Sequence, residues 1–484
     1  MRLSKSRLLA HLQCPKRLWL EVHRPQLGYY TSAARARFES GQRVGEMARR
    51  LYAQGREVGV AAGTDDWLSF DSTQGELFPR AEAGSAKVFF EATFRHEEVQ
   101  VRADVLEYCS GRTRLIEVKS GTRVKEEYVP DVAIQSWVIN GVGVRLDEVA
   151  VAHLNSKFVY PGNADYRGLL VEVPLGDLAS RVVPQVAIWA REARHTLEGS
   201  EPAIAVGKHC RTPHACPFVK YCWPRTEYPL HVLPKLGAKL DEYVAHGYRD
   251  VRDVPEEAVT GETRLRVWRA TVTGRADIQP ALGEELRAIS CPRYYLDFET
   301  IDFAVPIWAG TRPRQAIPFQ WSIHIEKSAG QVEHLEYLDL SGELPAPGIA
   351  QALLDAMGDS GPIIVYSSYE QRCIETLAQL VPPLAEALRA LVPRLVDVLP
   401  IFQRHYYHPA MKGSWSIKAI LPTVVRGMRY EDLGDIREGE AAQQAYLEAT
   451  HPSTSVQRRD EIARLLLEYC RFDTQALVRL LQAF

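Results

Sequence analysis

No stretch of this sequence has the run of about 18 or more apolar residues that a membrane-spanning helix needs. Residues 1–14, MRLSKSRLLAHLQC, also lack an apolar core long enough for a secretory signal peptide. We therefore expect no membrane association and a cytoplasmic protein. Disulfides are rare in that compartment, so the eight cysteines of the chain need another explanation.

The sequence also has little net charge, no internal repeat and no glycine-rich phosphate loop of the GxxxxGK type. The missing loop counts against a small-molecule or nucleotide hydrolase. A formal net charge of −3 shows that the whole chain is not a polycation, although charge can be distributed unevenly. Residues 1–50 contain eleven Lys and Arg against three Glu. This excess fits a nucleic-acid partner, and it equally fits the solvated face of a helix.

What is present is an ordinary globular composition, 46% hydrophobic and 25% charged, in a chain of 484 residues that has room for two or three domains. Alternating runs such as EVQVRADVLEY and RLIEVKSG predict strands, joined by a turn at residues 109–111, and residues 61–86 read as a loop. A second α/β pattern starts near residue 291 and ends in a helix over 457–483. The sequence therefore predicts an α/β protein with three segments, 1–227, 228–290 and 291–484, of which the second is a helical linker.

Asp104, Glu117 and Lys119 lie on the two strands of the predicted hairpin. Side chains at positions i and i+2 of a strand share a face, so Glu117 and Lys119 point together, and Asp104 can reach them from the neighbouring strand. Converging carboxylates can hold Mg²⁺ or Mn²⁺. A lysine beside such an ion can position the attacking water and stabilise charge on a phosphate. Ordinary solvated strands carry the same pattern, so it is only one indication of a nuclease.

Together with Gln135 on the next predicted helix, this pattern resembles the PD-(D/E)XK nucleases of the RecB-like branch over about residues 1–225. The resemblance implies a restriction-endonuclease-like fold, metal ligation by Asp104 and Glu117, catalysis by Lys119 and support from Gln135. Many relatives have a metal-binding His on an early helix. Here Glu46 either takes its place or the site lacks that ligand.

Four cysteines bracket this first domain: Cys14 precedes Pro-Lys-Arg, and Cys210, Cys216 and Cys222 recur at intervals of six residues. Four thiolates can hold an iron–sulphur cluster or a tetrahedral Zn²⁺, and such a clip would tie the two ends of the domain together. The pattern resembles the iron–sulphur staple of the AddB and CRISPR-adaptation nucleases, which implies a 4Fe-4S cluster, with zinc as the alternative. The C-x5-C-x5-C spacing departs from the C-x-x-C pair of several relatives. Coincidentally buried cysteines are the third interpretation.

The C-terminal half contains a second group of acids. Asp297 and Glu299 share one face of the predicted strand YYLDFETI, and Tyr469 and Asp473 are one turn apart on the final predicted helix. This order resembles the DEDD exonucleases with an RNase H-like fold over about residues 291–484. The resemblance implies that Asp297, Glu299 and Asp473 bind two metal ions and that Tyr469 orients the attacking water.

The middle acid of this second group has two candidates. We assign Glu370 to it, with Asp397 as the rival, because the family usually has an Asp in an Asn-x-x-x-Phe-Asp context that this sequence lacks. The segment 405–422 interleaves His, Tyr, Lys and Trp415, which suits stacking on bases and phosphate contact, or covers the core. The short helices over 235–275 loosely resemble a helix-hairpin-helix DNA-backbone binder.

The two resemblances together describe a bacterial family that fuses a RecB-like nuclease domain to a DEDD-type exonuclease domain. We therefore expect a metal-dependent nuclease that cuts nucleic acid, with single-stranded DNA ends favoured and RNA also compatible. The alternative is a nucleic-acid-binding scaffold in which one or both sites are degenerate. Such a scaffold would bind tightly in a salt-dependent way and would not cut.

Overall fold

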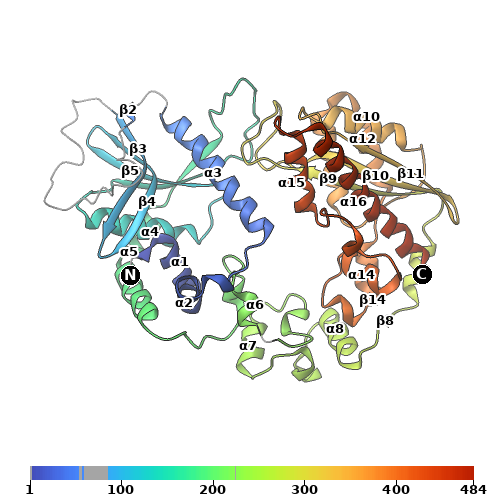
Figure 1. Cartoon of the computed structure of the whole chain (residues 1–484), viewed down its shortest axis with the longest axis horizontal. Coiled ribbons are helices and arrows are strands. Elements are labelled where there is room, and N and C mark those ends of the chain that lie inside the picture. The colour runs from blue at the N-terminus through green and yellow to red at the C-terminus, as the bar shows by residue number, and fades with distance from the viewer. Residues whose placement is uncertain (1–2, 54–56, 59–85, 224) are drawn as a thin grey trace. The chain divides into compact units, whose positions relative to one another are not determined.

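The computed structural model describes residues 3–53, 57–58, 86–223 and 225–484 and shows a mixed α/β protein (Figure 1). The chain divides into two compact units. Unit 1 contains Met1–Trp223 and Phe303–Arg314, and unit 2 contains Pro224–Asp302 and Gln315–Phe484. The loop predicted over residues 61–86 lies, apart from Ala86, outside the described residues. Every helix within them is too short or too polar to cross a lipid bilayer.

Unit 1 is built on a seven-stranded sheet with the strand order β2-β3-β4-β5-β6-β7, and β1 pairs with β4 beside this path. Strands β3, β4 and β5 are antiparallel, β6 runs parallel to β5 after a helical crossover, and β7 is antiparallel to β6. The strands are β1 Leu3–Ser4, β2 Glu57–Val58, β3 Ala86–His96, β4 Val99–Cys109, β5 Arg112–Lys119, β6 Glu148–Leu154 and β7 Leu170–Pro174.

The helices of unit 1 bury apolar side chains in one core with this sheet, which includes Leu8, Val101 and Ile134. Five of the eight buried residues of the crossover helix α4 are apolar, and the other three are Asp131, Gln135 and Ser136. The helices are α1 Lys5–Gln13, α2 Pro15–His23, α3 Ser32–Ala53, α4 Tyr128–Gly141, α5 Gly176–Glu198 and α6 Val219–Cys222.

The hairpin predicted around residues 109–111 is confirmed. Ser110 and Gly111 both have a positive φ, 51° and 80°, as a two-residue type I′ turn requires. The turn sets the register of the two strands, in which Val105 pairs with Ile116. This register brings Asp104, the preceding residue on β4, next to Glu117 on β5.

Unit 2 contains a five-stranded sheet with the order β11-β10-β9-β12-β13. Strands β9, β10 and β11 are antiparallel, and β12 and β13 run parallel to β9. The strands are β9 Arg293–Ile301, β10 Ile317–Ser328, β11 Gln331–Leu338, β12 Ile363–Val365 and β13 Leu395–Asp397. The helices that follow β11 are α10 Ala346–Ala356, α11 Tyr369–Leu380, α12 Ala385–Leu391, α13 Leu399–His405, α14 Ile417–Val424, α15 Gly439–Thr450 and α16 Val456–Gln482.

The alternation of β9 divides its side chains between two faces. Leu296 and Phe298 join a core with α10, α11 and α12 on one face. The long helix α16 packs on the other face (Figure 1), where Ser322 and His324 of β10 hydrogen-bond to Thr474 at 2.8 Å. Asp297 and Glu299 therefore face α16, as their spacing predicts.

One predicted helix, 369–391, is broken in the structure. α11 ends at Leu380, a 3₁₀ turn spans Pro382–Leu384, and α12 begins at Ala385. Pro382 and Pro383 have no amide hydrogen, and their rings clash with a continuing helix, so the single-helix prediction is wrong.

Residues 228–290, predicted as a helical linker, belong to unit 2. They contain α7 Lys239–Ala245, α8 Glu262–Thr273, β8 Asp277–Ile278 and α9 Ala281–Arg287. Two 3₁₀ turns separate α7 from α8. β8 pairs with β14, Tyr406–Tyr407, which joins this segment to the rest of unit 2.

Residues 303–314 follow β9 in the sequence but pack with unit 1. The amide of Gly310 donates to the carbonyl of Tyr160 at 2.8 Å, and the amide of Tyr160 donates to Thr311 at 2.9 Å. Ala304 is buried in a cluster with Val44. The structure therefore differs at this segment from a division that assigns all of 291–484 to one domain.

Candidate catalytic and metal-binding sites

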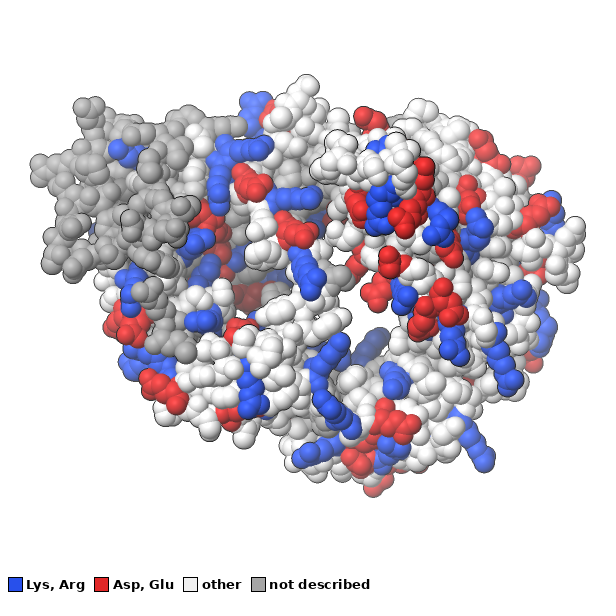
Figure 2. All heavy atoms as spheres, in the orientation of Figure 1, with Lys and Arg blue, Asp and Glu red and all other residues white. Residues whose placement is uncertain are grey.

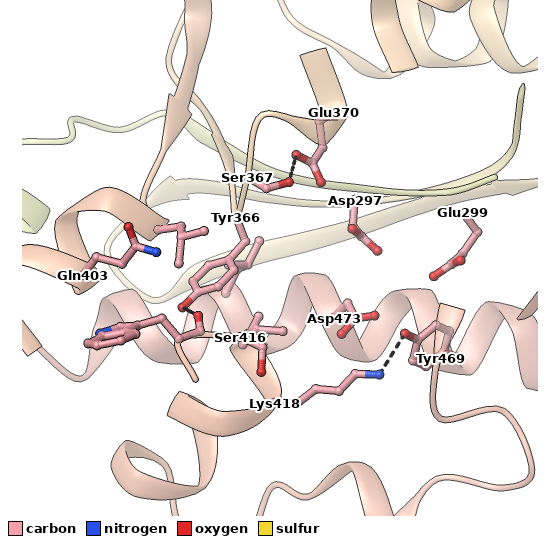
Figure 3. A pocket seen from close by; sticks show the side chains of 14 residues that line it. Asp297, Glu299, Tyr366, Ser367, Glu370, Gln403, Ser416, Lys418, Tyr469 and Asp473 are labelled. Carbon is pink, nitrogen blue, oxygen red and sulfur yellow. Dashed lines mark hydrogen bonds between the residues drawn. The ribbon is translucent and has the colours of Figure 1, made fainter. Parts of the chain in front are cut away.

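The carboxylates of Asp297, Glu299 and Asp473 converge in unit 2, where one oxygen of each lies within 4.8 Å of the others (Figure 3). Asp297 and Glu299 project from β9, and Asp473 projects from α16 on the same face of the sheet. The structure thus brings together three acids that are up to 176 positions apart in the sequence.

Glu299 and Asp473 are buried and Asp297 is partly buried, and the charges of the three carboxylates repel. Burial, followed by the charges of Asp473 and Glu299, raises the pKa of Asp297 well above its ordinary value. Burial and the charge of Asp473 raise the pKa of Glu299 to about 8, and burial raises the pKa of Asp473 to about 6. Because a bound cation would relieve this repulsion, the all-oxygen donor set fits Mg²⁺ or Mn²⁺.

Two tyrosines and one lysine surround the acids. The hydroxyl of Tyr430 donates to Asp473, and the Lys418 ammonium donates to the hydroxyl of Tyr469 at 3.3 Å. Lys418 Nζ also lies 5.0 Å from the ring centre of Tyr430 and 5.2 Å from that of Tyr469. Burial raises the pKa of Tyr469 above its usual range, so the hydroxyl keeps its proton. Neither Lys418 nor Tyr430 was among the residues predicted for the site.

Glu370 and Asp397, the rivals for the middle acid, have different environments. Glu370 lines the same cavity as the three acids from the first turn of α11, and burial raises its pKa to about 7. The Asp397 carboxylate instead accepts a hydrogen bond from the amide of Leu399 at 3.0 Å. The structure brings Glu370, and not Asp397, to the cavity, although Glu370 lies outside the tight group of three.

The cavity over these acids has a volume of about 460 Å³, within the range of sites that hold small ligands. Trp415 forms part of its wall, and its indole N–H donates to the carbonyl of Tyr406 at 2.8 Å. The Tyr366 hydroxyl donates to the carbonyl of Trp415 at 2.8 Å. The segment 405–422 therefore covers the core and lines the cavity, with Trp415 held in place rather than exposed.

In unit 1, Glu117 is the centre of a network of charged side chains. Its carboxylate accepts a hydrogen bond from Lys119 at 2.7 Å and from Gln135 at 2.7 Å. Asp104 lies on the adjacent strand and accepts a hydrogen bond from the amide of Val118 at 2.8 Å. The four residues that the sequence places in this site are therefore neighbours in the structure.

Two further residues complete the network and were missed in the sequence. Lys5 on α1 lies 2.8 Å from both Glu117 and Asp131, and Lys119 lies 2.5 Å from Asp131. Asp131 lies four residues before Gln135 on α4, and the Gln135 side chain also donates to it at 3.1 Å. That i, i+4 spacing was a usable signal for Asp131, whereas nothing in the sequence near Lys5 indicates its partner. No described contact joins Glu46, which is exposed on α3, to this network.

The charge balance of the unit 1 site differs from that of unit 2. Although burial opposes ionisation of Glu117, the ammonium groups of Lys119 and Lys5 hold its pKa below the ordinary value. Burial and the charge of Glu117 raise the pKa of Asp104 to about 7. Since two lysines already compensate Glu117 and Asp131, this donor set is less suited to a cation than the three acids of unit 2.

The four cysteines singled out in the sequence line one cavity of unit 1, together with apolar side chains such as Leu20 and Val206. Cys14 directly follows α1, and the late trio lies on the segment after α5. Gln13 connects the two regions, because its side chain donates to the carbonyls of His209 and His214 at 2.7 and 2.8 Å.

The spacing of the thiols bears on what they could hold. In a tetrahedral zinc site with Zn–S bonds of about 2.3 Å, the sulphurs lie about 3.8 Å apart. Among the described residues, the acids of unit 2 are the only group of three or more such ligands within 4.8 Å of one another. No three of the described cysteines form such a group. Burial raises the pKa of Cys222 to about 11, and a ligand that binds thiolates would have to displace that proton.

Comparison with known families finds one match. Residues 294–416 match the model of a domain of unknown function, DUF2779. That range begins at β9 and ends in the segment that lines the cavity, and it includes Asp297, Glu299 and Glu370. No curated protein matches the chain.

Proposed function

We propose that the chain is a metal-dependent nuclease that hydrolyses phosphodiester bonds of nucleic acid in the cytoplasm. The observation that carries the proposal is the buried group of Asp297, Glu299 and Asp473 on the wall of a cavity. Three carboxylates confined in this way favour divalent cations, and a phosphodiester supplies further oxygens for the same ions.

The residues of the cavity have distinct roles in this proposal. Asp297, Glu299 and Asp473 hold Mg²⁺ or Mn²⁺, with Glu370 nearby as a further acid. The bound metal supplies charge stabilisation for the attacking and leaving oxygens of the phosphate. Tyr469 stays protonated and orients the attacking water, and Lys418 stabilises the negative charge that develops on the phosphate.

The arrangement of unit 2 supports an RNase H-like exonuclease domain of the DEDD type. Its acids lie on the first strand of the five-stranded sheet and on the last helix, in the order that the resemblance implies. In unit 1, the proximity of Asp104, Glu117, Lys119 and Gln135 supports the PD-(D/E)XK resemblance. We infer a 4Fe-4S cluster at the four cysteines, because they line one cavity and follow the pattern of the iron–sulphur resemblance.

The experiment is a cleavage assay on end-labelled single-stranded DNA and RNA with anaerobically purified protein, with Mg²⁺, Mn²⁺ or a chelator. Asp297→Ala and Lys119→Ala are assayed singly and together. We expect metal-dependent cutting that falls in one single variant and disappears in the double variant. The products of Asp297→Ala report the activity and the direction of cutting of unit 1, and those of Lys119→Ala report the same for unit 2. Cutting that persists in the double variant would refute the proposal.

The second candidate is a binding scaffold in which the unit 1 site is degenerate. Lys5 favours it, because this second ammonium occupies oxygens of Glu117 and Asp131 that a metal ion would need. The scaffold predicts salt-dependent binding of nucleic acid by unit 1 and no loss of cleavage in Lys119→Ala. An unchanged rate in that variant, with full loss in Asp297→Ala, would assign all catalysis to unit 2.

A further inference from the structure

Unit 1 exposes aromatic side chains beside its cysteine segment. Tyr29 and Tyr30 are each 54% exposed, and Phe38 on α3 is 69% exposed. The backbone amide of Tyr29 donates to the carbonyl of Pro217 at 2.9 Å, which holds this pair of tyrosines against the cysteine segment. A group of exposed aromatic rings on one surface, unlike a single one, marks a candidate interaction site.

Cations accompany these rings. Lys220 Nζ lies 3.4 Å from the ring centre of Tyr29. Burial and the charge of Glu21 raise the pKa of Tyr30, and Arg17, which is ion-paired with Glu21 at 2.8 Å, lowers it. An aromatic face flanked by cations can stack on a base and attract the adjoining phosphate.

The positive charge continues onto α3 and the loop before α4. Burial lowers the pKa of His214, Glu127 opposes this, and Lys125, Arg37 and Arg17 lower it further. Three cations from separate elements therefore surround one histidine of the cysteine segment. Lys and Arg side chains gather on the surface over α3 (Figure 2), where Arg37 is exposed and Arg49 pairs with Glu91 at 2.6 Å.

Short contacts connect this region to the Glu117 site. His214 lies 3.6 Å from Glu127, and Lys125 lies 3.4 Å from the same carboxylate. The next residue, Tyr128, has Lys119 Nζ at 5.3 Å from its ring centre. The surface thus runs from the exposed tyrosines to the lysine of the candidate active site, within unit 1.

We propose that a single strand of nucleic acid lies along this surface, with bases stacked on Tyr29 and Tyr30 and phosphates beside the cations, and leads to Lys119; this rests on the proposed nuclease function. We name it the tyrosine–arginine surface. It consists of Arg17, Tyr29, Tyr30, Arg37, Lys125, His214 and Lys220. Its mixture of rings and cations favours an unpaired strand, because the bases of a duplex are not available for stacking.

The test is fluorescence anisotropy of labelled single-stranded DNA and RNA, with chelator present so that nothing is cut. Tyr29→Ala/Tyr30→Ala should weaken binding at least about fivefold, since each base that stacks on an aromatic side chain contributes about 1–3 kcal/mol. Tyr29→Phe/Tyr30→Phe keeps both rings and should bind like the unsubstituted chain. Both positions carry exposed rings, so we expect the variants to fold.

The charge test removes two cations in each of two places. Arg37→Ala/Lys220→Ala should reduce the slope of log affinity against log salt by about 1.4, since each phosphate contact on a single strand contributes about 0.7. Arg181→Ala/Arg191→Ala removes the same charge from exposed positions of α5 and should leave both slope and affinity unchanged. Equal effects of the two pairs would overturn the proposal, because general charge would then explain binding.

The outcomes separate this proposal from the function on which it rests. If the Tyr→Ala pair binds within about twofold of the unsubstituted chain while cleavage is intact, the surface is wrong and the nuclease stands. If the pair weakens binding but no form of the protein cuts, the surface stands and the nuclease fails. A preference for duplex over single-stranded DNA would also overturn the stacking arrangement.

Discussion

Lys418 is the one cation among the described residues that line the unit 2 cavity, and it faces four acids. Its ammonium is fixed between Tyr430 and Tyr469 and also donates to the carbonyl of Arg437. A charge that is already oriented needs no rearrangement as negative charge develops on a substrate. This makes Lys418 the side chain of the site whose removal should alter the rate more than the binding of a substrate.

We predict that Lys418→Met lowers kcat of the unit 2 activity by about 10²–10³-fold, with a smaller change in KM. The measurement is single-turnover cleavage in a Lys119→Ala background, which isolates unit 2. Lys412→Met makes the same change at an exposed position of the same segment and should leave the rate unchanged. A Lys418→Met rate within about twofold of the parent would contradict this role.

The raised pKa values of the acids also set a direction for stability. A carboxyl whose pKa is higher in the folded than in the unfolded chain holds its proton more tightly when folded. The folded state is therefore favoured at low pH and loses that advantage as the pH rises from the unfolded value, near 4, through the folded value. For Glu299 and Asp473 the folded values are about 8 and about 6.

We therefore predict that, with chelator present, the Tm of unit 2 falls as the pH rises from about 5 to about 8. Mn²⁺ should raise the Tm most at the upper end of this range, because the ligands must lose their protons to bind it. Differential scanning calorimetry with and without Mn²⁺ measures both effects. Glu299→Gln should flatten the fall, and an equally steep fall in that variant would contradict the assignment.

Local spacing predicted part of this site and could not predict the rest. Asp297 and Glu299 share a strand face, and Tyr469 and Asp473 share a helix face, so each pair follows from one element alone. Lys5 and Tyr430 could not be found in this way, because their partners are more than 40 positions away and meet them only through packing. The choice between Glu370 and Asp397 likewise depended on the direction of a buried side chain.

At the scale of elements, α1, α2 and the cysteine segment are fastened by polar contacts. The Trp19 indole donates to the carbonyl of Gly199 at 3.0 Å, and Gln13 donates to two carbonyls of the cysteine segment. These contacts hold Cys14 near Cys210, Cys216 and Cys222 without the help of a cofactor. The sequence predicted the four cysteines as a group, but not the side chains that position them.

We predict that Cys14→Ser and Cys216→Ser lose bound iron and lower the Tm of unit 1 by about 5–10 °C, as the loss of a few kcal/mol would. The measurements are metal analysis of anaerobically purified protein, visible absorbance and thermal unfolding. Cys109→Ser is the control, because Cys109 is exposed and away from the group. Bound zinc in place of iron would favour a zinc site over the 4Fe-4S cluster. A protein that contains neither metal, with or without the substitutions, would contradict both assignments.

The single helix predicted over 369–391 shows why an apolar pattern can mislead about the length of a helix. The apolar periodicity continues through the segment, and the two prolines interrupt only the backbone. The strand and hairpin predictions were more successful, because a two-residue turn with positive φ at Ser110 and Gly111 leaves few alternative registers.

At the scale of the whole molecule, unit 1 depends on a segment from the second half of the chain. Residues 303–314 bring Ala304 into its core and hydrogen-bond to Tyr160, and the Arg314 guanidinium donates to Ser40 at 2.5 Å. No local pattern in 303–314 indicates this packing, which is why the sequence assigned the segment to the second domain.

We predict that Ala304→Asp destabilises unit 1 by about 3 kcal/mol, because it buries an unpaired charge. Hydrogen exchange in the full chain should show faster exchange of α3 and β6, with unit 2 unchanged. Ile307→Asp places the same charge in the same segment at a position that is 49% exposed and should have little effect. Unchanged exchange of α3 and β6 in Ala304→Asp, or the same increase in both variants, would contradict a structural role for the segment.

Helix α1 carries Lys5 at its first residue and is followed by Cys14, so one rod about 13 Å long has a different chemistry at each end. A rigid rod transmits displacement in both directions. If the cysteines hold a cluster, its loss frees the far end and shifts the ammonium beside Glu117. Thermodynamic reciprocity then links the two sites: whatever effect the cluster has on the affinity for nucleic acid at the Glu117 site, bound nucleic acid has on the affinity for the cluster. Helix α1 would then couple the state of the cofactor at the cysteines to the candidate site around Glu117.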